Sequence, residues 1–200
     1  GLGGVAGGDD TWEIHIDGDH SADQMRWNAT EIEDETEREL AQGRFSQSYH
    51  TRFPQLGDTG GDHWSWFWMS KSTWHGNPPW ASYGFQLDGE IGSGEVTASI
   101  EVEYTAFDDF LWNDPANSVV HQFQEGEIMG LDWQAADSDA PGEDGKVHAS
   151  WYSGATDSWK TTASANDFLL APIDPRVDFS TMPTAVEESS WGRIKAVYVQ

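Results

Sequence analysis

The stretch T-W-E-I-H-I-D-G-D-H-S-A-D, residues 11–23, decides the fold. Over residues 11–16, apolar and polar side chains alternate with a period of two, which predicts a β-strand with one buried face. The strand ends in a polar turn around one glycine. The apolar side chains are Trp12, Ile14 and Ile16, and the polar ones between them are Glu13 and His15.

The turn that follows this strand concentrates oxygen atoms. It holds Asp17, Asp19 and Asp23 within seven residues. Hard cations such as Ca²⁺ bind roughly six to eight oxygens from carboxylates, carbonyls and water, so the turn is a candidate calcium site. The other interpretation is a polar turn whose aspartates hydrogen-bond the local backbone. The sequence leaves both open.

A second acidic turn, D-S-D-A-P-G-E-D-G, follows another predicted strand, residues 128–136. We predict calcium ligands here too, although neither turn matches the full EF-hand pattern. A weaker acidic patch, Asp108, Asp109 and Asp114, is interpreted as a solvated loop. The candidate ligands of the second turn are Asp137, Asp139, Glu143 and Asp144.

One helix is predicted, over the acidic residues 30–42, with Thr30 as N-cap, Glu33 as its capping-box partner and Gly43 just beyond its end. The rest reads as strands between turns of Gly, Asp and Pro, which predicts an all-β, antiparallel, jelly-roll-like β-sandwich. The further strands are expected over residues 45–53, 64–70, 82–87, 95–104, 128–136, 147–153 and 168–170. We expect a flexible glycine-rich arm (1–8), the sandwich (9–171), and a linker with a C-terminal strand (172–200).

The composition of the chain disfavours several classes of function. The net charge is −25, from 35 acidic against 10 basic residues, which disfavours nucleic acid as a partner. The acidity fits either a salty habitat or many bound cations. Without cysteine the chain forms no disulfide, and no apolar run is long enough to span a membrane. The start at Gly1 instead of Met indicates either that a leader has been removed or that the chain is a fragment, and we expect a secreted protein.

Catalytic signatures are missing from the sequence. It has no G-x-S-x-G motif, phosphate-binding loop or dinucleotide fingerprint, so we expect no enzyme. The seven histidines show no zinc-binding spacing and are interpreted as surface or strand residues, with His20 in the first acidic turn as the one of interest. Asn28 begins an N-A-T glycosylation sequon.

Two stretches resemble family 9 carbohydrate-binding modules of secreted bacterial proteins. These are D-T-W-E-I-H-I-D at residues 10–17 and G-E-I-M-G-L-D-W-Q-A-A-D-S-D at residues 126–139. The resemblance covers roughly residues 9–171 and implies a secreted, non-catalytic sandwich that binds calcium and a polysaccharide or other glycan. The family usually carries several strands before the first of these stretches, and this chain starts almost at it.

Such modules stack exposed aromatic rings on sugars. Among the 12 tryptophans, Trp74, Trp80 and Trp112 lie in predicted loops and are candidate glycan contacts, with core packing as the other interpretation. Trp64, Trp66 and Trp68 share one face of a predicted strand, so we expect them in the core.

The chain ends suggest an alternative function. W-G-R-I-K-A-V-Y-V-Q, residues 191–200, reads as a short apolar strand that could pair with its own sheet or with a neighbour's. Exchange of such strands would make the chain its own partner, as a subunit of an extracellular filament or surface layer.

Overall fold

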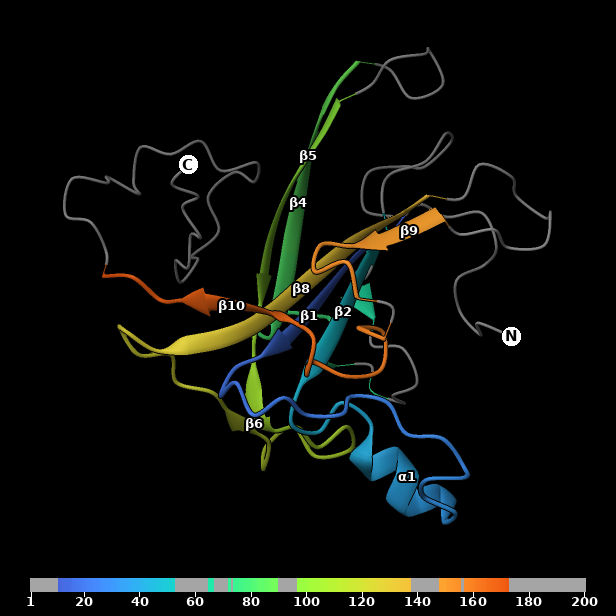
Figure 1. The fold of residues 1–200 in the computed structure, drawn as a ribbon. Helices are drawn as coiled ribbons and strands as arrows, with labels where there is room; N and C mark the ends of the chain where they lie inside the picture. The colour runs from blue at the N-terminus through green and yellow to red at the C-terminus, as the bar shows by residue number, and fades with distance from the viewer. Residues whose placement is uncertain are drawn as a thin grey trace.

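A computed structural model describes residues 11–52, 65–66, 72, 74–89, 97–137, 148–155 and 157–172. This part of the chain is built of antiparallel strands and one short helix (Figure 1), which confirms the all-β prediction. The elements are β1 (Thr11–Asp17), α1 (Glu35–Ala41), β2 (Gln47–Arg52), β3 (Ser65–Trp66), β4 (Ala81–Asp88), β5 (Thr97–Tyr104), β6 (Phe107–Asp109), β7 (Val119–Val120), β8 (Ile128–Asp137), β9 (His148–Trp151) and β10 (Asn166–Leu169).

The main sheet has β1 at its centre. Its strands run in the order β10-β8-β1-β2-β3, and β9 also pairs with β8. Ile14 lies opposite Tyr49 on β2 and opposite Trp133 on β8. Directly paired residues point to the same side of a sheet, so this register fixes which side chains of the three strands share a face.

The face that carries Ile14 is the apolar one. Ile16 and Tyr49 on this face form a buried core with Ala81 and Ala106. The Tyr104 ring stacks on Tyr49 with their centroids 4.2 Å apart. Ala81 and Tyr104 come from the same end of the β4–β5 hairpin, which crosses the main sheet in Figure 1 and extends beyond it. The base of this hairpin therefore covers the apolar face.

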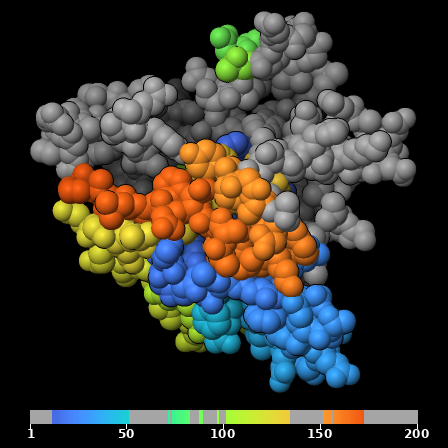
Figure 2. Space-filling model, viewed as in Figure 1, coloured from blue at the N-terminus to red at the C-terminus, as the bar shows by residue number. Residues whose placement is uncertain are grey.

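The opposite face is polar, and it is buried as well. His15, Asp17 and Asp132 are all less than 3% exposed. The loop between β9 and β10 lies over this face: Ser153 binds Asp132 through its backbone N–H and its hydroxyl, and the Thr162 hydroxyl donates to Asp17. Figure 2 shows this segment in orange against the N-terminal residues in blue. A period-two sequence pattern distinguishes the two faces but does not predict that a loop covers the polar one.

The N-cap of helix α1 lies four residues later than predicted, so the prediction that Thr30 is its N-cap is wrong. Asp34 caps the helix, and its Oδ1 accepts a hydrogen bond of 2.9 Å from the Glu37 N–H. Thr30 instead donates to the Asn28 side chain in a separate turn. Gly43 follows the helix with a φ of 64°, as the predicted C-terminus requires. The helix does not begin at Thr30 because the Asn28 side chain accepts a hydrogen bond from the Thr30 N–H, which competes with helix formation.

Two short strands were not predicted, β6 and β7, which pair with a shifted register. The prediction of a solvated loop is wrong for Asp108 and Asp109, which lie on β6: Asp109 binds Arg44 at 2.7 and 3.0 Å, and Asp108 lies 2.6 Å from His121. Strands of two or three residues are too short to show a hydrophobic period. The predicted strand at residues 45–53 begins two residues later, at Gln47. In the described part of the chain, no helix is long and apolar enough to cross a membrane.

Several predictions lie outside the described residues. These are the arm at residues 1–8, the linker and strand beyond residue 172, and the side chains of Trp64, Trp66 and Trp68.

Candidate functional site

The buried polar face of the main sheet brings together residues from three strands. Glu13 on β1 lies opposite His50 on β2 and Gln134 on β8. His15, two residues along β1, is on the same face and lies opposite Asp132 on β8. The sheet register therefore assembles titratable groups that are far apart in the sequence.

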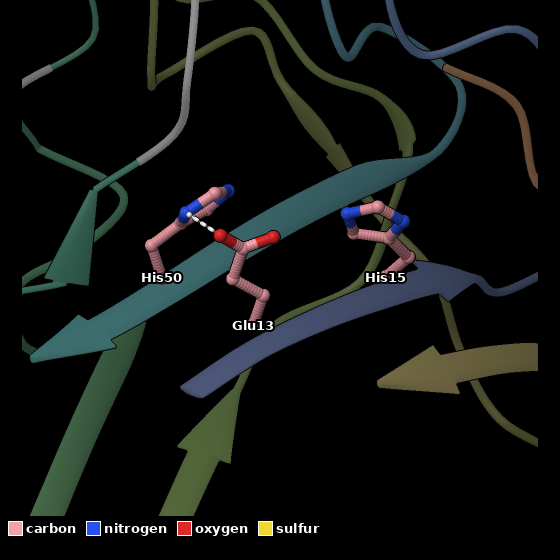
Figure 3. A group of neighbouring side chains, drawn as sticks. All are labelled: Glu13, His15 and His50. Atoms are coloured by element: carbon pink, nitrogen blue, oxygen red, sulfur yellow. Dashed lines mark ion pairs between the residues drawn. The ribbon is translucent and has the colours of Figure 1, made fainter. Parts of the chain in front are cut away.

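Glu13, His15 and His50 form the tightest group on this face. One potential ligand atom from each residue lies within 4.8 Å of the other two. The Glu13 carboxylate lies between the two imidazole rings (Figure 3), with its Oε1 3.2 Å from Nδ1 of His50. The Glu13 side chain is 12% exposed and that of His50 is 6% exposed, so the group is nearly closed off from solvent.

Neighbouring groups hold these three side chains in place. Gln134 donates from Nε2 to the Glu13 carboxylate. The Ser48 hydroxyl lies 3.0 Å from Nε2 of His50, and His15 hydrogen-bonds to the backbone of Ser158.

Burial sets the protonation of the group. It lowers the pKa of His15 to about 3, and the electrostatic influence of the neighbouring His50 adds to this effect. For Glu13, burial acts to raise the pKa, but His50 and Gln134 outweigh it and the pKa is lowered. Near neutral pH the group therefore offers a neutral imidazole at His15 and an ionised carboxylate, the forms in which these residues bind metals.

Sequence reasoning missed this group. The spacing of Glu13 and His15 was a signal, because residues two apart on a strand share a face. The third member, His50, could not be predicted from the sequence, because it joins the group through the β1–β2 register. Four histidines of the described chain are buried, which the sequence did not indicate: His15, His50, His75 and His121.

The first acidic turn does bring its three aspartates together. Oxygens of Asp17, Asp19 and Asp23 lie within 4.8 Å of one another. His20 and Ala22 have φ values of 56° and 64°, a left-handed geometry that folds the turn back on itself. His20 points away from the three carboxylates to Asp167, 2.8 Å from its Oδ1.

The hydrogen bonds expected of a polar turn are present as well. The Asp17 carboxylate accepts from the N–H groups of Ser21 and Ala22, at 3.2 and 2.8 Å, and from Thr162 Oγ1 at 2.9 Å. Burial raises the pKa of Asp17, whereas hydrogen bonds from Ser21 and Asp17 outweigh burial and lower that of Asp19. The turn therefore combines a rigid backbone with closely spaced carboxylates.

The second acidic turn is only partly described. Asp137 ends β8 and pairs in register with His148 on β9. Asp139, Glu143 and Asp144 lie outside the described residues, so their prediction as calcium ligands stays a prediction.

The three candidate glycan-binding tryptophans are half-buried. Trp74 donates from Nε1 to the backbone oxygen of Trp112 at 2.8 Å. It packs on Trp80, Phe107 and Phe110 with ring centroids 5.1–5.6 Å apart. These contacts place the rings of Trp74 and Trp80 in an aromatic cluster with Phe107 and Phe110, and Trp112 is joined to it through its backbone oxygen.

A more exposed aromatic pair lies beside the main sheet. Tyr152 is 56% exposed and stacks on Trp133, with ring centroids 4.0 Å and planes 14° apart. Trp159, 44% exposed, lies under the guanidinium of Arg26, whose Cζ is 4.6 Å from the ring centroid.

The predicted glycosylation residue, Asn28, is exposed, and its Oδ1 accepts a hydrogen bond from the Thr30 N–H.

No family model matches the chain, and no match was found among curated proteins.

Proposed function

We propose that the chain is a secreted, non-catalytic β-sandwich domain of carbohydrate-binding-module type that is stabilised by calcium. The observation that carries this proposal is the convergence of Asp17, Asp19 and Asp23 in the turn after β1. Three carboxylates within one turn repel each other unless protons or cations offset their charge. A divalent cation would join the central strand β1 to its turn.

Calcium is the divalent cation that suits this turn. All the side-chain ligands are oxygens, and Ca²⁺ tolerates irregular geometry and completes its shell with water or backbone carbonyls. The chain has no cysteine, so bound cations would provide the cross-link that many secreted domains obtain from disulfides. In the proposed sandwich, the β4–β5 hairpin belongs to the second layer, since its base packs on the apolar face of the main sheet.

The exposed ring of Tyr152, which stacks on the half-buried Trp133, is the proposed glycan contact. A flat ring that is more than half exposed can pack on the apolar C–H face of a sugar, and its stacking partner holds it in one orientation. Trp74, Trp80 and Trp112 remain candidates through the edges that their cluster leaves accessible.

Calorimetric titration tests the cation part of the proposal. We expect the wild-type protein to bind Ca²⁺ and the Asp19→Asn variant to bind it more weakly. Asp19 is exposed and ends no strand, so this substitution should leave the fold intact. Equal binding by both proteins would exclude the turn as the calcium site.

A glycan panel tests the recognition part, with calcium-loaded protein. Heat with at least one soluble polysaccharide in the wild type, and its loss in Tyr152→Ala, is the expected result. Leu169→Ala is the matched control, because it removes another exposed apolar side chain from the edge of the sheet. A panel without heat from any glycan would contradict the binding-module function.

A second candidate function is self-assembly by strand addition. Within the described chain, β10 ends the order of the main sheet, and its Leu169 is 67% exposed. An added strand from a neighbouring copy would pair there. Electron microscopy of the purified protein distinguishes the two functions: filaments support assembly, and monomers at high concentration with calcium oppose it.

A further inference from the structure

We propose that Glu13, His15 and His50 form a second metal site, distinct from the acidic turn, that takes a transition-metal ion such as Zn²⁺. The three side chains come from positions that the sheet register fixes on one buried face, two on β1 and one on β2. This site would lie between the two central strands of the main sheet.

The distances suit a small cation. Ligand atoms around a tetrahedral Zn²⁺ ion, bound at about 2.0–2.1 Å, lie roughly 3.3 Å apart. In this group Oε1 of Glu13 is 3.2 Å from Nδ1 of His50, and the set including His15 stays within 4.8 Å. We expect a bound ion to draw the His15 ring closer, because 4.8 Å is longer than the separation of tetrahedral ligand atoms.

The donor set distinguishes this site from the acidic turn. Two imidazole nitrogens and one carboxylate suit Zn²⁺ and related ions, whereas Ca²⁺ prefers oxygen ligands alone. The acidic turn offers three carboxylates, and the imidazole of His20 within it hydrogen-bonds to Asp167 instead. We therefore expect the two sites to select different metals.

The surrounding residues resemble those that support metal ligands. Imidazole ligands usually engage a second group through their other ring nitrogen, and ligating carboxylates are usually hydrogen-bonded. Here Ser48 lies 3.0 Å from Nε2 of His50, which leaves Nδ1 facing Glu13. Gln134 holds the other carboxylate oxygen of Glu13.

An ion would reach the site past Glu13, the most exposed of the three side chains. Three protein ligands leave a fourth tetrahedral position for water. The alternative is a hydrogen-bonded polar core without a metal, and the two interpretations differ in what they predict for added Zn²⁺.

The test is a titration of the metal-stripped protein with Zn²⁺, followed by X-ray absorption spectroscopy. Co²⁺ serves as a visible reporter of coordination number. We expect one ion per chain with two imidazole ligands, in the presence of excess Ca²⁺. The Glu13→Gln and His50→Gln variants should lose more affinity than the roughly 10- to 100-fold that removal of a supporting residue costs.

Two further variants keep the test decisive. Ser48→Ala removes only the group that orients His50, and should weaken Zn²⁺ by about 10- to 100-fold with the fold retained. His20→Gln is the matched control, since it removes an exposed histidine outside the group and should leave Zn²⁺ binding unchanged. Absence of Zn²⁺ binding to the wild type would overturn the proposal, and so would binding that His20→Gln abolishes or that Ser48→Ala and Glu13→Gln both leave intact.

Discussion

Asp17 lies directly opposite Gly130 across the β1–β8 ladder, and its side chain lies over the space that a side chain at position 130 would need. A Cβ atom built on Gly130 would be 3.0 Å from the Cβ of Asp17 and 3.6 Å from that of Ala165. The glycine in the G-L-D stretch therefore makes room for the first residue of the acidic turn.

Gly130→Ala should destabilise the protein by about 1–3 kcal/mol, because the methyl group would displace the buried Asp17. Chemical denaturation measures the change. Gly154→Asn is the control: position 154 has a φ of 74° with open space around it, and asparagine tolerates that backbone geometry. Equal losses in both variants would show that the contact with Asp17 is not the cause.

Thr162→Val tests the contact between the β9–β10 loop and the acidic turn. The substitution removes the hydroxyl that donates to Asp17 at 2.9 Å and keeps the shape of the side chain. A hydrogen bond to a charged group is worth about 1.5–3 kcal/mol, so we expect a loss of that size in the free energy of unfolding. Thr162→Ser, which keeps the hydroxyl, should lose less. A valine variant as stable as the wild type would mean that the loop is held in other ways.

The central strand and its apolar face were predictable, and the burial of its polar face was not. The alternation of apolar and polar residues over 11–16 predicted strand β1 and the buried position of Ile16, because successive side chains of a strand point to opposite faces of the sheet. The polar positions of the same strand read as solvent-facing, but the β9–β10 loop covers them. One of these contacts, from the Thr162 hydroxyl to Asp17, joins residues 145 positions apart, and no local sequence pattern encodes such a contact.

His75 should make stability depend on pH. Burial, and then the electrostatic influence of His50, lowers its pKa from 6.5 to about 4. The unfolded chain therefore binds a proton that the folded chain does not bind between these pH values. The contribution of neutral His75 to the free energy of unfolding should be fully present above about pH 6.5. It should fall by up to about 3 kcal/mol as the pH drops to 4.

NMR titration of the His75 ring checks this directly, with His75→Gln to assign its resonance. We expect a midpoint near 4. A midpoint near 6.5 would contradict the burial of this side chain against Tyr49 and Phe110.

The start of α1 can be tested with two alanine substitutions. Asp34→Ala removes the observed N-cap and should cost about 1 kcal/mol. Thr30→Ala, at the position that the sequence favoured, should cost less than about 0.5 kcal/mol, because it removes a hydroxyl whose hydrogen bond goes to the exposed Asn28 side chain. The reverse order of the two losses, measured by chemical denaturation, would restore the predicted cap.

The acidic turn was predictable from the sequence, whereas the histidine–glutamate group was not. Asp17, Asp19 and Asp23 are neighbours along the chain, so their convergence needs only a tight turn. His50 is 37 positions from Glu13 and joins it through strand pairing, which depends on register. The same limit applies to Tyr152, whose stacking on Trp133 follows from the contact between β8 and the segment after β9.

The most direct test of the account is the melting temperature of the metal-stripped protein as Ca²⁺ is added, compared with the Asp19→Asn variant. A ligand at 100 times its dissociation constant stabilises the folded state by about 2.7 kcal/mol, which corresponds to a rise of roughly 5–10 °C for a chain of this size. We predict that rise in the wild type and a much smaller one in the variant. A melting temperature that neither Ca²⁺ nor a chelator changes would contradict the calcium-stabilised fold.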